Sequence, residues 1–242
     1  MISIRNLSLT LNSNPVLQDI TLDLPDNKNT VILGRSGCGK TVLMKCVTSL
    51  FTPDAGEIYI DNERINHHNY QMDRGVLNKV GMLFQNAALL DSFTVFQNLA
   101  LPLSERTALT KEQIHEQIIS ILQYVGMQQT AELLPSELSG GMRKRIGLAR
   151  ALISNPKYII LDEPTTGLDP LTAQEVLDFL TYVIESRHLI AIAITHDPLC
   201  LKKLGEHIVI LDAGHVLYAG NQEHLKQTKD EAIAAFYRSY FQ

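Results

Sequence analysis

The sequence of 242 residues contains no tryptophan and only three cysteines, Cys38, Cys46 and Cys200. Three is not the even number of a disulfide framework, and the spacing between them is not that of metal ligands. This cysteine usage is typical of a reducing cytoplasm. The hydrophobic content of 45% supports a substantial core, either in one large α/β domain or in two modest ones.

Long apolar runs are also missing. No uninterrupted run approaches the roughly 18–20 residues that a membrane-spanning helix requires. The longest candidates, residues 158–161 and 189–194, have the length of strands, and residues 1–5 show no signal-peptide pattern. Any role at a membrane is therefore expected to depend on a partner protein.

A broad positive field is absent as well. The net charge is −5 and the isoelectric point is about 5.9, so we expect no nucleic-acid partner. The sequence contains neither internal repeats nor low-complexity segments.

The most informative motif present is a phosphate-binding loop of the form G-x-x-x-x-G-K-[ST]. It comprises Gly34, Arg35, Ser36, Gly37, Cys38, Gly39, Lys40 and Thr41. Residues 30–33 before it are apolar and predict a buried strand, and residues 42–47 can continue as a helix. A chance glycine-rich turn is the alternative, which this strand–loop–helix context disfavours.

The chemistry of this loop follows from its residue types. Glycines let successive N–H groups turn inward as an anion-binding nest, and the following helix adds partial positive charge at its N-terminus. Lys40 can supply a mobile charge to the β- and γ-phosphates, and Thr41 a hydroxyl to Mg²⁺. The loop therefore predicts binding of a nucleoside triphosphate.

Alternating and helical patterns organise the rest of the chain. Apolar alternation near the N-terminus predicts an antiparallel hairpin with its turn at residues 12–15. Further strands are predicted at residues 57–60, 80–84, 158–161, 189–194, 207–211 and 216–218. Residues 86–134 change to helical spacing, with a capping box at Thr110, and another helix begins with Asp169 as its N-cap. Strands alternating with helices predict an α/β fold whose parallel sheet is covered on both faces.

Two further motifs carry chemistry. A buried strand ends in Asp162 and Glu163, which suit a magnesium ligand and a residue that activates water. The alternative for this pair is two exposed carboxylates at a strand end. Ser139, Gly140 and Gly141 precede a predicted helix and form a second anion site on the same physical basis. A dimer in which each chain completes the other's nucleotide site would use both anion sites.

With these motifs, the chain resembles the nucleotide-binding subunit of ATP-binding cassette (ABC) transporters over roughly residues 1–220. The resemblance implies a P-loop NTPase (RecA-like) core with an N-terminal antiparallel β-subdomain and an α-helical insert. The core would comprise about residues 1–85 and 155–220, the helical subdomain residues 86–154, and a helical tail residues 221–242, all within one ABC ATPase domain.

The resemblance also implies roles for individual residues. Gln85 matches the glutamine that contacts Mg²⁺ and the attacking water. Asp162 and Glu163 match the magnesium aspartate and the catalytic glutamate, and His196 matches the histidine that contacts the γ-phosphate. The magnesium ligands would be Thr41, Gln85 and Asp162, and the cofactors ATP and Mg²⁺. Residues 138–142 resemble the signature motif, and two chains would close head to tail around two ATP molecules.

Two positions depart from the family pattern. Met142 replaces the glutamine that usually ends the signature, which leaves the Ser-Gly-Gly anion site intact. The aromatic residue that stacks on adenine in the family falls near Leu11, which offers apolar contact without a ring. Another residue of the neighbouring loop is the alternative cover for the base.

Residues 82–90 and 134–145 resemble the ATPase of Mla/Mce-type phospholipid transport systems. That resemblance implies an ATPase homodimer on the cytoplasmic face of the inner membrane, held there by permease subunits and working with a periplasmic lipid-binding protein of the MCE type. Alternatives are an ABC ATPase for an amino acid or a lipoprotein, and a soluble ABC ATPase acting on DNA or ribosomes.

The basic run Arg143, Lys144 and Arg145 has two interpretations. It could help to hold phosphate charge, or it could form a solvated helix face.

Overall fold

The computed structural model describes residues 1–67, 70–228 and 230–241. The chain divides into two compact units, one formed by Met1–Leu77 with Ile190–Gln242 and the other by Asn78–Leu189. Residue 242, the end of the predicted helical tail, lies outside the described residues. The domain boundaries expected from the sequence stay predictions.

The first unit contains an antiparallel sheet in the order β2-β1-β4-β5. Its strands are β1 Ile2–Leu11, β2 Asn14–Leu24, β4 Ala55–Ile60 and β5 Glu63–Arg64. The hairpin was predicted, but its turn is shorter than the expected residues 12–15. Asn12 and Ser13 alone form it, both with positive φ (50° and 65°), and β2 already begins at Asn14. Positive φ at both central positions suits the right-handed twist of a two-residue hairpin.

Four more strands of this unit run in the order β10-β9-β3-β8. They are β3 Thr30–Leu33, β8 Ile190–Ile194, β9 His207–Asp212 and β10 His215–Gly220. β3 pairs in parallel with β8 and β9, whereas β10 pairs antiparallel with β9. The sheet is thus mixed rather than wholly parallel, because the short turn at Ala213 and Gly214 returns the chain directly as a hairpin.

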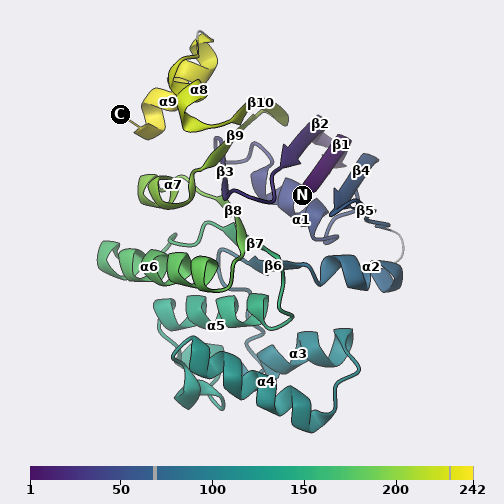
Figure 1. Ribbon diagram of the computed structural model, residues 1–242, viewed down its shortest axis with the longest axis vertical. Helices are drawn as coiled ribbons and strands as arrows, with labels where there is room; N and C mark the ends of the chain where they lie inside the picture. Colours follow the sequence, from purple (N-terminus) through teal and green to yellow (C-terminus); the bar gives the residue numbers. More distant parts are fainter. Residues whose placement is uncertain (68–69, 229, 242) are drawn as a thin grey trace. The chain divides into compact units, whose positions relative to one another are not determined.

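The helices of the first unit are α1 Lys40–Val47, α2 Tyr70–Leu77, α7 Pro198–Leu204, α8 Gln222–Lys226 and α9 Glu231–Phe241. Of these helices, α1 and α7 connect the strands of the unit, and α8 and α9 follow its last strand (Figure 1). α1 follows β3 directly after the glycine loop, and α7 packs against β3 and β8. The sequence interval predicted as a helical tail contains α8 and α9.

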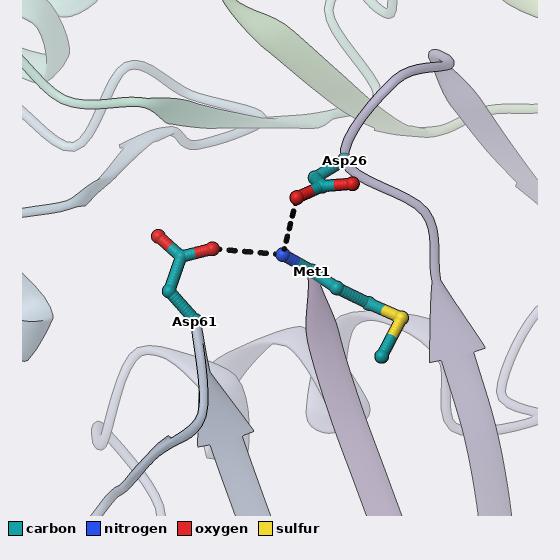
Figure 2. Close-up of polar contacts among 3 residues, drawn as sticks. All are labelled: Met1, Asp26 and Asp61. Carbon is teal, nitrogen blue, oxygen red and sulfur yellow. Dashed lines mark hydrogen bonds and ion pairs between the residues drawn. The ribbon is translucent and has the colours of Figure 1, made fainter.

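The ammonium group of Met1 forms ion pairs with two carboxylates (Figure 2). The Met1 ammonium donates to Asp61 Oδ1 at 2.8 Å and to Asp26 Oδ2 at 3.1 Å. Ion pairs this exposed contribute at most about 1 kcal/mol each. The start of β1 is therefore held mainly by its core residues Ile2 and Ile4, which are fully buried.

The second unit joins a parallel strand pair to a group of helices. Its elements are β6 Val80–Leu83, α3 Val95–Arg106, α4 Lys111–Tyr124, α5 Gly140–Leu152, β7 Tyr158–Asp162 and α6 Pro170–Ser186. β6 and β7 pair from Val80 with Tyr158 to Leu83 with Leu161. Figure 1 shows α5 between α6 and the α3–α4 pair, and α5 also packs on β6. α5 is thus the central helix of this unit.

Capping residues set the helix starts as the sequence predicted. Thr110 accepts from the Gln113 N–H at 3.3 Å while the Gln113 side chain accepts from the Thr110 N–H at 2.9 Å, which confirms the capping box of α4. Asp169 caps α6 by accepting from the Thr172 N–H at 3.1 Å, with Pro170 at the first helical position.

Among the described residues, no helix combines the length and the apolar character needed to cross a membrane.

Replacing Thr110 by alanine is expected to lower the free energy of unfolding by about 1 kcal/mol, since the Gln113 N–H loses its acceptor. Chemical denaturation followed by circular dichroism measures this loss. Thr110→Ser is the matched control, because serine keeps the hydroxyl acceptor. An equal loss in both variants would contradict a capping role.

Candidate functional site

The phosphate loop closes on itself where β3 passes into α1. A Cβ on Gly34 would lie 2.1 Å from the Leu211 carbonyl oxygen, so only glycine fits beside β9 there. A Cβ on Gly39 would lie 2.9 Å from both the Val16 oxygen and a Leu17 methyl group, at a φ of +106°. The sequence therefore needs glycine at these positions for close backbone approach as well as for conformation.

Lys40 lies within the curve of this loop. Its ammonium group donates to the carbonyl oxygens of Gly34 at 2.8 Å and Arg35 at 3.0 Å. The side chain is 9% exposed, which places a positive charge directly beside the backbone that the sequence predicted as a phosphate cradle. Burial raises the pKa of the neighbouring Cys38 thiol, so this cysteine remains in its neutral form.

His196 lies at the same edge of the first unit as the loop. The parallel register matches Ile32 of β3 with Ile194 of β8, so both strands end side by side. The phosphate loop follows the end of β3, and His196 follows β8 after Thr195. His196 is exposed, and the next residue, Asp197, caps α7 by accepting from the Leu199 N–H at 2.8 Å. The structure thus brings the loop and the predicted γ-phosphate contact to one edge.

Leu11, the position predicted near the base, and the start of β2 differ in their surroundings. Leu11 ends β1 at the tip of the hairpin, paired with Asn14. Val16 and Leu17 of β2 instead lie against Gly39 at the end of the phosphate loop. The segment that borders the loop is therefore the start of β2, which sequence pattern alone did not single out.

In the second unit, the other predicted residues gather at the ends of β6 and β7. Because Leu83 pairs with Leu161, the residues after each strand leave the same edge. Gln85 follows β6 and is exposed, Asp162 ends β7 and is only 4% exposed, and Glu163 comes next. Glu163 has a φ of +47°, and its carboxylate accepts from the Thr166 hydroxyl at 3.3 Å. The interpretation of two freely exposed carboxylates does not hold for Asp162.

The signature residues begin α5 of this unit. Ser139 is the N-cap and accepts from the Met142 N–H at 3.2 Å. Gly140 and Gly141 follow, and a Cβ at either would lie 3.1 Å from Leu168 or 3.3 Å from Thr172, respectively. The two glycines therefore let the start of α5 approach the start of α6 closely.

The structure places Lys144 where the sequence did not predict it. The basic run predicts a cation that holds phosphate or lies on a solvated face, but Lys144 is only 5% exposed. Its ammonium group donates to the Gln85 carbonyl oxygen and, at 3.4 Å, to the Glu163 carbonyl oxygen. Burial lowers the pKa of Lys144, while the Asp162 and Glu163 carboxylates oppose that shift. A solvated face describes exposed Arg143 but not Lys144.

The chain matches a family model described as ABC transporter over residues 17–166. It is 33% identical, over 98% of its length and 89% of the relative, to the intermembrane phospholipid transport system ATP-binding protein MlaF of Haemophilus influenzae. It is 34% identical, over 93% of its length, to the methionine import ATP-binding protein MetN of Mannheimia succiniciproducens, and the match spans 66% of that relative.

Solved structures agree with these sequence matches. The fold matches a dimeric ATP-binding cassette in a post-hydrolysis state, bound to ADP and Pi, with a TM-score of 0.80. The two chains are 28% identical, and the match covers 91% of this chain and 98% of that one. The predicted fold class, an α/β cassette with an antiparallel β-subdomain, is confirmed.

Substituting Gly34 by alanine is expected to lower the free energy of unfolding by about 3 kcal/mol, because the added methyl group overlaps the Leu211 carbonyl. Gly37→Ala is the matched control: its φ is +80° but no atom lies within 4 Å of an added Cβ. The expected cost there is about 1 kcal/mol. Urea unfolding of both variants measures the difference, and equal losses would show that close approach at Gly34 is unimportant.

Proposed function

The chain belongs to the ABC transporter family, and we propose that it is the ATP-hydrolysing subunit of a transporter that moves phospholipid between the inner and outer membranes. The proposal has three parts: the bound nucleotide, the dimer that completes its site, and the cargo of the membrane partners.

The residues of the first unit suit a triphosphate. Close packing against the Leu211 carbonyl requires glycine at position 34, and the Lys40 ammonium group donates to the Gly34 carbonyl oxygen within the same loop. The family resemblance implies Thr41 of the first unit, and Gln85 and Asp162 of the second, as magnesium ligands. Their side chains offer hydroxyl, amide and carboxylate oxygens, the hard ligands that Mg²⁺ prefers. Magnesium ATP held by these residues would supply the phosphoanhydride bond to be hydrolysed and a divalent charge to neutralise phosphate oxygens.

The chain's own residues then have distinct tasks. Glu163 accepts a proton from the attacking water or orients it, and the Gln85 amide helps to place that water. Lys40 binds the β- and γ-phosphate oxygens, and His196 contacts the γ-phosphate from the end of β8. These roles follow from the family resemblance and from the strand ends at which the residues lie.

The observation that carries the proposal is the capped N-terminus of α5, which the sequence predicts as a second anion site. Ser139, Gly140 and Gly141 form a capped helix N-terminus, a feature that a phosphate-loop kinase or GTPase does not need. We propose that this end of α5 contacts the γ-phosphate bound to a second copy of the chain. ATP binding would then close the homodimer, and hydrolysis would open it.

The membrane partners and the cargo are inferred from similarity. The MlaF relative aligns with 98% of this chain, and the Met142 signature with its basic run resembles that group. We therefore propose integral-membrane permease subunits, a periplasmic MCE-type lipid-binding protein, and a place at the cytoplasmic face of the inner membrane. Import of methionine or another amino acid is the second candidate, favoured by MetN matches of 34% identity.

Replacing Glu163 by glutamine is expected to lower kcat for ATP by about 100-fold or more while ATP binding persists, because the amide cannot accept the proton. The ATP-bound variant should elute as a closed dimer in size-exclusion chromatography with light scattering. Lys40→Ala is the contrasting variant, with ATP affinity reduced roughly 10- to 100-fold and no dimer.

The exposed lysine Lys226 provides the matched control, since Lys226→Ala leaves the proposed site untouched. Wild-type turnover in Lys40→Ala would overturn the assignment of the phosphate loop. A Glu163→Gln variant that stays monomeric with ATP, alone and with its membrane partners, would overturn the shared-site dimer.

Purifying the native complex in detergent is expected to yield a permease, an MCE-type lipid-binding protein and bound glycerophospholipid. Mass spectrometry of the purified subunits identifies the proteins, and mass spectrometry of the organic extract identifies the lipid. An amino-acid permease without co-purifying phospholipid would replace the phospholipid proposal by the import of an amino acid.

A further inference from the structure

We propose that Lys144 is a positioning residue for ATP hydrolysis, holding the backbones of Gln85 and Glu163 in the arrangement that catalysis requires. The proposal rests on the proposed ATPase function and adds to it a residue whose role lies within the protein rather than on phosphate. Lys144, Gln85 and Glu163 all belong to the second unit.

The contacts of Lys144 are specific to the two residues that act on water. Its ammonium group is the shared donor to the Gln85 and Glu163 carbonyl oxygens. These two residues follow different strands, β6 and β7, and are 78 positions apart in the sequence. One cation thus fixes the distance between two backbone segments that carry the catalytic amide and carboxylate.

The buried ammonium group of Lys144 depends on the acceptors and negative charges around it. Lys144 as a residue is only 5% exposed, and the loss of hydration at its ammonium group is costly unless acceptors and negative charge replace the water. The two carbonyl oxygens provide the acceptors, and the Asp162 and Glu163 carboxylates provide the charge. Removing the ammonium group would leave two carbonyls without this donor and change the field at both carboxylates.

The same face of α5 holds the loop after Gln85 at two more points. Gly147, three residues after Lys144, packs so closely that an added Cβ would lie 2.8 Å from the Ala87 methyl group. Arg150, three residues further, donates to the Ala87 and Ala88 carbonyl oxygens at 2.8 and 2.7 Å. Residues at this spacing lie on one side of a helix, so α5 contacts the loop along nearly two turns.

The backbone that these residues hold is conformationally unusual. Glu163, Ala87 and Ala88 have positive φ values of 47°, 58° and 49°. Non-glycine residues adopt this region at a cost of about 1–2 kcal/mol, so they remain there only where contacts define the conformation. The Lys144 and Arg150 donors to these carbonyl oxygens supply such contacts.

The position of Lys144 on α5 also links the two parts of the proposed dimer site. α5 begins at the Ser139 cap, the proposed contact with the partner's nucleotide, and Lys144 lies in the second turn. A shift of α5 on closure would therefore move the Gln85 and Glu163 carbonyls of the same chain. This connection makes Lys144 a mechanical link between nucleotide contact at one site and water activation at the other.

Lys144→Met, which keeps the aliphatic stem and removes the donor, tests the proposal in the purified full-length chain. We expect kcat for ATP to fall about 10- to 100-fold with KM within about twofold of the wild-type value, as for other residues that orient a catalytic group. Lys144→Arg retains the charge and the donors and should recover part of the loss. Lys111→Met, the same change at an exposed lysine of α4, is the matched control.

Hydrogen exchange of the nucleotide-free protein provides a second readout. The Ala87 N–H donates to Phe84 O at 2.9 Å and the Thr166 N–H to Glu163 O at 3.2 Å, so both amides report on the two held segments. Their exchange should become faster in Lys144→Met and stay at the wild-type rate in Lys111→Met. Amides of α1, in the other unit, serve as the internal reference.

The outcomes separate this proposal from the ATPase assignment. Absence of ATP hydrolysis by the wild-type chain and by its native complex would overturn the proposed function itself. If the wild type is active, unchanged kcat or unchanged exchange in Lys144→Met overturns the role of Lys144. A fall in kcat that matches a loss of folded protein in urea titration, or that Lys144→Arg does not relieve, likewise overturns it.

Discussion

The parallel pairing of neighbouring strands is the constraint on which both parts of the site depend. Parallel strands end at a common edge, so residues distant in sequence leave the sheet side by side. The pairing of β3 with β8 brings the phosphate loop and His196 to one edge of the first unit. The pairing of β6 with β7 does the same for Gln85 and Asp162 in the second. A shift in either register would separate the groups to which we assign roles in hydrolysis.

Local sequence signals predicted the elements that create these edges. The apolar runs gave β3, β6, β7 and β8 to within about two residues, because a strand buried on both faces needs apolar residues throughout. The caps Thr110 and Asp169 marked helix starts correctly, since the bond that each accepts comes from a residue only three positions along the chain. Apolar runs and helix caps act over a few neighbouring residues, and the backbone alone fixes the geometry of those short-range contacts.

Features that depend on contacts distant in sequence were missed. Lys144 stands between two arginines, so composition alone favours a solvated face. Its helical spacing relative to buried Leu148 and Ala151 does place it on the covered side of α5. Its partners are two backbone carbonyls that follow separate strands. Because every residue has a backbone carbonyl, the residue types do not reveal these partners. The same holds for the start of β2, which borders the phosphate loop through the Val16 carbonyl oxygen.

Cargo and hydrolysis are governed by different residues, which explains the pattern of similarity. Two relatives whose names refer to phospholipid and to methionine align with this chain at 33% and 34% identity over nearly the same residues. Phosphate cradling, magnesium ligation and water activation need the same groups whatever is transported. Lys144 on α5, in the role proposed for it, acts on the Gln85 and Glu163 backbones and not on phosphate. A cassette can therefore keep the same hydrolytic groups while it serves a transporter of another cargo, and this is why relatives of both kinds match the chain at similar identity.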